Sequence, residues 1–366
     1  MSRLRDKRIR AGHRGLAAAA IALAVCLAVP GAAAAGQDEL KGGSVDIQLA
    51  GSHGLKLSPR SLHLAITGGA VDPINGSGTV EVAGRFRIKR GKRTSKVKVT
   101  GLTFGADGGA GSIAAKVGKR KVGRFGILSG GQVSRDGWGA RITGVTATLG
   151  AKGSKALVSA KGGQRLGTVS ATTVPRSVEV LPGGTLVFSA DNGFANKLLA
   201  HCVTPLGVGV IPPATQNLTV FTFPVTGGSV SPDFDAGTVV SGGGQTITKD
   251  SSLPVPFTCN QGPPVGTKIT QTEFQAQFEL QALASFTVLP DGPVGIGALG
   301  KFDLGPASKS ADPVSKQVTI SDAPVHLDLL SAFILNQVLP NESGDPNNDF
   351  REGDLLGTMS LSVKTH

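Results

Sequence analysis

One segment of this sequence occurs twice, and that repetition limits the folds open to the chain more than any other feature. TGGAVDPINGSGTVEVAGRFRI spans 67–88, and TGGSVSPDFDAGTVVSGGGQTI spans 226–247, so the offset is 159 residues and ten of 22 positions are identical. Four further segment pairs recur in the same order: 43–50 with 184–190, 122–128 with 299–305, 142–149 with 320–327, and 165–174 with 355–364. This ordered recurrence indicates a duplicated domain.

The recurring segments place the first module at 43–175 and the second at 176–366. The offset between paired segments rises from 141 residues at the first pair to 190 at the last, so the second module is expected to carry inserted loops. Each module is long enough to bury a hydrophobic core of its own.

Apolar and polar residues alternate in and around the recurring segments. The apolar sets that share one face are Leu62, Leu64 and Ile66; Phe86 and Ile88; Val97 and Val99; and Phe274, Ala276, Phe278 and Leu280. A period of two is typical of half-buried antiparallel strands. Near the end of the second module, 327–339 instead fits a short amphipathic helix, and its counterpart at 149–160 is a poorer helix because of its glycines. We therefore predict an all-β, mainly antiparallel protein with two β-sandwich-like modules, each with a short helix near its C-terminal end.

Charge divides unevenly between the modules. Residues 36–175 contain 22 Lys and Arg against 7 Asp and Glu, whereas 176–366 contain 9 against 17. The basic residues concentrate in one expected hairpin, RFRIKRGKRTSKVKV, on which alternate basic side chains point outward. Its candidate anion-binding residues are Arg85, Arg87, Lys89, Arg90, Lys92, Arg93, Lys96 and Lys98.

Three interpretations of this basic hairpin stay open. It binds an anionic partner, such as a cell-wall polymer or a membrane surface. Alternatively, it is a solubilising face that blunts an exposed sheet edge. The third interpretation is internal, with the basic module docked on the acidic one. Nucleic acid is not expected, because aromatic residues hardly interleave with the basic ones.

The first 35 residues predict export from the cell. A basic stretch, an apolar run of 14 residues over 16–29 and a small-residue region follow one another there, as in a secretory signal peptide. We expect the protein outside the cell or at its surface, with no membrane-spanning segment once this peptide is removed. Removal also takes away Cys26, which leaves Cys202 and Cys259 as an expected disulfide in an oxidising compartment.

The order of the recurring segments resembles that of the HtaA-type haem-binding domain of bacterial surface haem-uptake systems. The resemblance covers most of both modules and rests on LAITGGAVDPINGSGTV, on FPVTGGSVSPDFDAGTV and on the LGT segment that closes each copy. It implies a β-sandwich-like extracellular domain that captures haem through a tyrosine ligand supported by a histidine. This sequence departs from that pattern, because it has no Tyr and no His within 80–100 or 239–258.

Another histidine would have to replace the missing ligands. His63 and His326 lie between apolar residues of expected strands, so both are expected to point into solvent, and His201 adjoins a cysteine of the expected disulfide. His53, in the segment GSHGL, is the best substitute by position and is our candidate haem ligand. The C-terminal His366 is expected to be mobile.

No catalytic or metal site is expected. The sequence lacks a G-x-S-x-G elbow, an H-E-x-x-H helix and a phosphate-binding P-loop. The leading hypothesis is thus an exported, non-catalytic binding protein of HtaA-like ancestry, with haem or a haemoprotein as one candidate partner. The alternative is a structural or adhesive module that binds anionic cell-envelope polymer through the basic hairpin.

Overall fold

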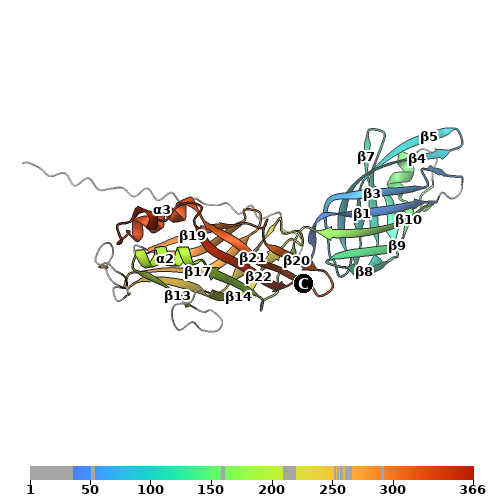
Figure 1. Cartoon of the computed structure of the whole chain (residues 1–366). Coiled ribbons are helices and arrows are strands. Elements are labelled where there is room, and N and C mark those ends of the chain that lie inside the picture. The colour runs from blue at the N-terminus through green and yellow to red at the C-terminus, as the bar shows by residue number, and fades with distance from the viewer. Residues whose placement is uncertain are drawn as a thin grey trace, which may run out of the picture.

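The computed structural model describes residues 36–50, 54–157, 161–208, 220–250, 253, 255, 259, 266–289 and 292–366. Strands make up 62% of the structure and helices 11%, and every strand pair in the described part is antiparallel, which confirms the predicted all-β class. Two sheets lie end to end, each around its own hydrophobic core (Figure 1). The expected signal peptide and His53 lie outside the described residues.

The first sheet has ten strands and closes on itself. The order is β10-β1-β3-β4-β5-β6-β7-β9, and β10 pairs with β9 as well as with β1, which makes a barrel of eight strands. Closure removes the exposed edges that an open sheet would present. The strands are β1 (Asp38–Leu49), β2 (Lys56–Ser58), β3 (Ser61–Val71), β4 (Gly78–Arg90), β5 (Arg93–Phe104), β6 (Gly111–Val117), β7 (Arg120–Ser129), β8 (Gln132–Asp136), β9 (Gly139–Leu149) and β10 (Arg165–Pro175).

The second sheet has twelve strands, and β15 pairs with both β14 and β17. Strands β22, β12, β14, β15, β17, β18, β19 and β21 follow one another there in the same order as β10, β1, β3, β4, β5, β6, β7 and β9 in the first sheet. The strands are β11 (Val178–Glu179), β12 (Thr185–Ala190), β13 (Val203–Val208), β14 (Val220–Val230), β15 (Gly237–Ser241), β16 (Gly244–Lys249), β17 (Lys268–Gln277), β18 (Ala282–Leu289), β19 (Gly292–Phe302), β20 (Ser308–Asp312), β21 (Gln317–Leu327) and β22 (Leu355–Lys364).

The repeated 22-residue segment forms the same turn in both sheets, between β3 and β4 and between β14 and β15. At two positions of this segment only glycine fits for steric reasons. A Cβ on Gly69 would lie 2.0 Å from the carbonyl oxygen of Thr79, and one on Gly228 would lie 2.1 Å from that of Thr238. Both glycines also have positive φ angles, +118° and +125°, which other residues rarely adopt. Identity at these positions therefore follows from backbone geometry.

The described part of the chain contains three α-helices: α1 (Ala151–Ala156), α2 (Asn192–Ala200) and α3 (Leu329–Val338). The sequence predicts α1 and α3, each just before the last strand of its sheet. The N-terminus of α3 is capped by Asp328, whose carboxylate accepts the Leu330 N–H at 3.0 Å. Asp191 caps α2 in the same way, and this helix was not predicted. No helix in the described ranges is long and apolar enough to cross a membrane.

Among the apolar residues predicted to share a strand face, one is exposed. Phe274, Ala276 and Phe278 are buried as predicted, but Leu280 is 61% exposed. The chain turns immediately after Phe278, where the Gln281 N–H donates to the Phe278 carbonyl at 3.2 Å. The prediction extended the strand past its end because polar and apolar residues go on alternating through the turn.

A bridge joins Cys202 to Cys259, whose Cα atoms are 5.8 Å apart and which stand 57 residues apart in the sequence. Cys202 ends the turn after α2, and both cysteines are buried. The disulfide expected from the cysteine count is thus present in the structure.

The only tryptophan of the chain connects the two sheets. Trp138, in the turn between β8 and β9, is 8% exposed and belongs to the hydrophobic core of the second sheet. Its indole N–H donates to the Thr365 hydroxyl at 2.7 Å, and the Lys316 ammonium lies 5.7 Å from the ring centroid. The same ammonium donates to the Gly137 carbonyl, and burial, followed by the nearby charge of Arg135, lowers the pKa of Lys316.

Charged pairs complete this junction. The Lys41 ammonium contacts the carboxylates of Asp233 at 2.8 Å and of Asp235 at 2.5 Å. These hydrogen bonds raise the pKa of Lys41 and lower the pKa of Asp235. The Arg176 guanidinium lies 3.6 Å from one carboxylate of each sheet, on Glu39 and Glu279.

Candidate basic binding face

Basic side chains form rows across neighbouring strands of the first sheet. Arg85 on β4 is paired in register with Lys98 on β5, Lys98 with Lys116 on β6, and Lys116 with Lys121 on β7. Directly paired residues point to the same side of a sheet, and neighbouring strands lie about 4.8 Å apart. One row of four cations therefore crosses four strands.

Two shorter rows lie beside it. Arg87 is paired with Lys96 and with Ser58, and Lys89 is paired with Lys56. All these side chains alternate with buried core residues, such as Phe86 and Val97, so they are on the outer side of the sheet, as the sequence predicts. We call this set the basic face: Lys56, Arg85, Arg87, Lys89, Lys96, Lys98, Lys116 and Lys121.

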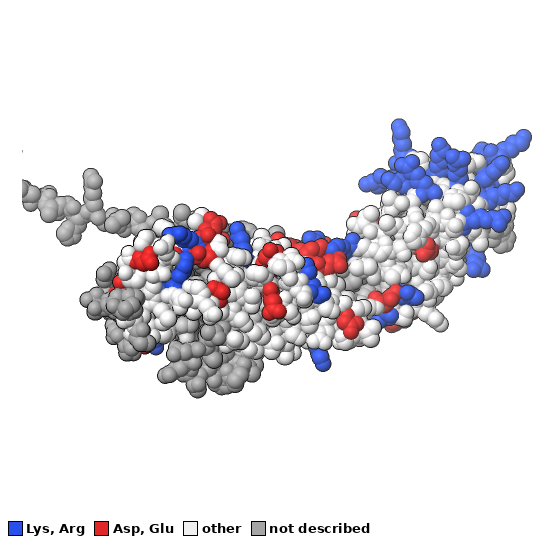
Figure 2. Space-filling model, viewed as in Figure 1, with Lys and Arg blue, Asp and Glu red and all other residues white. Residues whose placement is uncertain are grey.

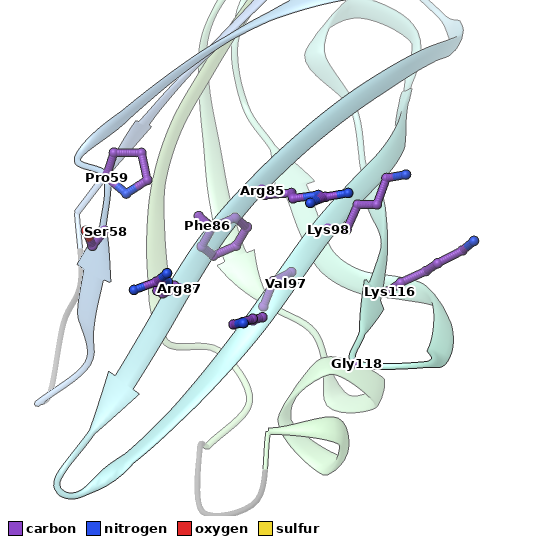
Figure 3. Close-up of a pocket in the computed structure, with 10 residues that line it drawn as sticks. Ser58, Pro59, Arg85, Phe86, Arg87, Val97, Lys98, Lys116 and Gly118 are labelled. Atoms are coloured by element: carbon purple, nitrogen blue, oxygen red, sulfur yellow. The ribbon is translucent and has the colours of Figure 1, made fainter.

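The basic face contains an open groove of about 650 Å³. Arg85, Lys98 and Lys116 lie side by side along one part of it, whereas Arg87 points toward Ser58 and Pro59 on the other (Figure 3). Its polar lining is cationic, and no carboxylate is among the described residues that line it. The side chains that line the groove therefore suit an anionic ligand.

Acidic partners are missing from this surface. Among the ion pairs of the described ranges, none involves a residue of the basic face. Lys and Arg gather at the end of the first sheet that lies away from the second sheet, and most of the visible Asp and Glu lie elsewhere (Figure 2). Like charges that face each other directly across strands destabilise a sheet. The arrangement therefore leaves an uncompensated positive potential at this end of the molecule.

The junction between the sheets uses other cations. Lys41 and Arg176, not the hairpin of β4 and β5, contact carboxylates of the second sheet. The interpretation in which the basic hairpin itself docks on the acidic module therefore does not describe this structure (Figure 2).

Three of the eight candidate residues depart from the outward pattern. Arg90 and Arg93 are paired with each other at the end of the hairpin, on the same side as the buried Ile88, and Lys92 lies in the turn between the strands. Conversely, Lys56, Lys116 and Lys121 belong to the basic face although they were not predicted to. Their alternating positions in short basic segments were visible, but the strand order that brings them beside Arg85 and Lys89 was not.

None of the described histidines is among the residues that line the groove, and three of them contact other groups. His63 is exposed and contacts the Asp46 carboxylate at 2.7 Å. His201 is buried, with its ring nitrogens against the carbonyls of Leu339 and Asn348 and its ring stacked on Phe350 at 4.4 Å between centroids. His326 contacts the Gly353 carbonyl at 3.1 Å.

These contacts give His201 a structural role that its neighbour Cys202 did not suggest. No group of three or more His, Cys, Asp or Glu suited to a metal ion occurs in the described part of the chain. The candidate haem ligand His53 lies outside the described residues, so its role stays a prediction.

The fold and this surface define an all-β protein whose first sheet carries an open, strongly basic face. No family model matches the chain, and no curated protein matches it. Two solved structures from Corynebacterium glutamicum are similar to it. The C-terminal domain of HtaA is 14% identical with a TM-score of 0.35, over 52% of this chain and 99% of that one. The haem-binding protein HtaB is 16% identical with a TM-score of 0.31, over 52% of this chain and 97% of that one. At these values neither structure assigns a ligand or a residue role to this chain.

Proposed function

We propose that this protein is a non-catalytic binding protein of the cell exterior that holds an anionic envelope polymer on its basic face. The observation that carries the proposal is the row Arg85–Lys98–Lys116–Lys121, which crosses four strands without an acidic partner in the described ranges. A row of cations about 5 Å apart matches the repeating charges of a polyanion better than it matches a single small anion.

A purely solubilising face does not require this order. Solubility is served by mixed charges, and interspersed carboxylates would relieve the repulsion between paired cations. Five cations of the basic face also line one open groove: Arg85, Arg87, Lys96, Lys98 and Lys116. Both features support binding over solubility alone.

Retention on immobilised poly(glutamate) in a salt gradient tests the proposal. Replacing Arg85, Lys98 and Lys116 with Gln should weaken binding by about 100-fold, because each basic residue near an anionic surface contributes about 1 kcal/mol. The control replaces three exposed lysines of the second sheet, Lys268, Lys309 and Lys364, so the change in net charge is the same. Equal weakening by both variants would show only a net-charge effect and would contradict a specific face.

The proposal includes export and descent from a duplicated HtaA-type domain. The ordered sequence repeat, the matching strand order of the two sheets and the N-terminal signal-like segment support this descent and location. Expression of the gene with and without 1–35, followed by fractionation, tests export: the protein lacking this segment should stay inside the cell.

Haem stays a hypothesis that rests on the sequence resemblance. The chain has no Tyr, and the histidines His63, His201 and His326 all have the contacts described above. Titration of the purified protein with haem, followed through the Soret band, tests it directly. A saturable shift that His53→Ala abolishes would establish the ligand, and the absence of any saturable shift would exclude haem.

A further inference from the structure

Arg90 and Arg93 lie where the hairpin of β4 and β5 should be apolar. In register, Phe86 pairs with Val97, Ile88 with Ser95, and Arg90 with Arg93. Phe86, Ile88 and Val97 are buried in the first core, so the next pair along the same side brings two guanidinium groups to the mouth of the barrel. This pair is on the opposite side of the hairpin from the basic face.

A cavity of about 350 Å³ lies at that mouth. Its apolar wall consists of Leu55, Ile88 and Leu157, which are all buried. Its polar wall includes Arg90, Arg93 and Ser95, and the described residues that line it include no carboxylate. The cavity therefore has one cationic wall and one apolar wall.

One atom of this polar wall lacks a partner. The Nη1 atom of Arg90 is buried, and it has no hydrogen-bond partner in the described structure. Arg93, directly opposite, is exposed, and neither arginine forms an ion pair among the described residues. A buried donor without an acceptor, beside a second like charge, destabilises the unliganded protein. An anion between the two groups would relieve both penalties.

We infer that this cavity is a binding site for a single phosphate group. A carboxylate is planar, so its two oxygens suit one guanidinium fork in the same plane. A phosphate monoester presents three oxygens in a tetrahedral arrangement, so two forks from opposite strands and the Ser95 hydroxyl have acceptors in different directions. The exposed Arg93 leaves the site open to a phosphate that is free or carried on a larger molecule.

This site is separate from the basic face and does not depend on the proposed function. It uses different residues, on the other side of the hairpin, and it recognises one group instead of a polymer. The variants therefore separate the two sites: Arg90→Met should weaken phosphate binding and leave retention on poly(glutamate) unchanged, whereas the Gln variant of Arg85, Lys98 and Lys116 should do the reverse.

Calorimetric titration of the full chain with inorganic phosphate, glycerol 3-phosphate and vesicles containing phosphatidic acid tests the inference. Saturable binding of the soluble compounds that Arg90→Met weakens identifies a free phosphate or phosphate ester, and binding of the vesicles alone that Arg90→Met weakens identifies a lipid headgroup. Arg90→Met should weaken phosphate binding at least ~10-fold, because it removes one of two charge-assisted forks. Arg93→Met, at an exposed position, should weaken it similarly without risk to the core.

A matched control is Arg124→Met, which removes an exposed arginine of β7 outside the cavity and should bind phosphate like the unaltered protein. Thermal unfolding adds a second readout. In phosphate-free buffer Arg90→Met should raise the melting temperature, because a buried unpartnered group is lost. Added phosphate should raise the melting temperature only of the protein that retains Arg90. Phosphate binding of equal strength in the Arg90→Met variant, or no saturable binding of any of the three probes, would overturn the inference.

Discussion

The hydrogen bond between Trp138 and Thr365 allows a direct test of how the two sheets are joined. Thr365→Val keeps the volume of the side chain but removes the acceptor that receives the indole N–H at 2.7 Å. It also removes the hydroxyl donor to the Lys316 carbonyl at 3.1 Å. Trp138 and Thr365 are only 8% and 3% exposed, so water cannot readily replace the lost partner. A buried donor left without an acceptor costs about 1–3 kcal/mol.

The assay uses the composition of the chain. Because Trp138 is the only Trp and there is no Tyr, indole fluorescence reports this junction alone. With a denaturant slope of about 2 kcal/mol per M, the urea midpoint of the fluorescence transition should fall by about 0.5–1.5 M. Far-UV circular dichroism, recorded in parallel, shows whether the remaining strands unfold in the same transition.

Thr79→Val is the matched control, since Thr79 is exposed on β4 and a surface substitution of this kind changes stability by within about 0.5 kcal/mol. Equal midpoints for Thr365→Val and Thr79→Val would contradict a stabilising role for this hydrogen bond. A native emission maximum typical of a solvent-exposed indole would contradict the burial of Trp138.

Three further predictions concern the turn glycines, one acidic group and the disulfide. Gly69→Ala should destabilise the protein by at least about 1 kcal/mol in urea unfolding, because its Cβ would lie 2.0 Å from the Thr79 carbonyl at a positive φ angle. Burial raises the pKa of Asp38 to about 6, with Arg135 opposing and Asp72 adding to the shift. Its contribution to stability is thus full below the unfolded pKa of about 4 and lost as pH rises through about 6, so Asp38→Asn should flatten the dependence of the melting temperature on pH between these values. Replacing both bridged cysteines with Ser should lower the free energy of unfolding by about 4 kcal/mol, because the bridge closes a loop of 57 residues.

Each of these predictions has its own control. Gly123→Ala introduces a Cβ with nothing within 4 Å and should be nearly neutral; equal loss from both glycine variants would contradict the steric argument. A melting temperature that still depends on pH in the same way after Asp38→Asn would assign the dependence to another group. Stability unchanged by reduction would show that the bridge does not constrain the unfolded chain.

Local patterns sufficed for much of this fold. Period-two alternation predicted the buried faces of Phe86, Ile88, Val97 and Val99, because a strand with one side in the core has that repeat whatever its neighbours are. The same rule failed at Leu280, where alternation continues through a turn. Helix α2 was not predicted, because its nine residues include a glycine and only a short apolar stripe.

Part of the basic face could likewise be predicted from local spacing, and part could not. The hairpin's own charges were visible from spacing, and their outward direction follows from alternation with the core residues. Lys116 and Lys121 join the row only through pairing with β5 and β6, which no local spacing specifies. The different role of Arg90 and Arg93 depends equally on register, because a shift by one residue would place them with the outward cations.

The chain's sequence is sufficient for the class of fold, the repeated turn and the excess of positive charge in its first half, since alternation, glycine and charge are properties of neighbouring residues. Three features arise from contacts between residues far apart in the chain. They are barrel closure, the insertion of Trp138 into the second core and the alignment of distant lysines in one row. Such contacts depend on strand order and register, which follow from the packing of the whole core and not from any one segment.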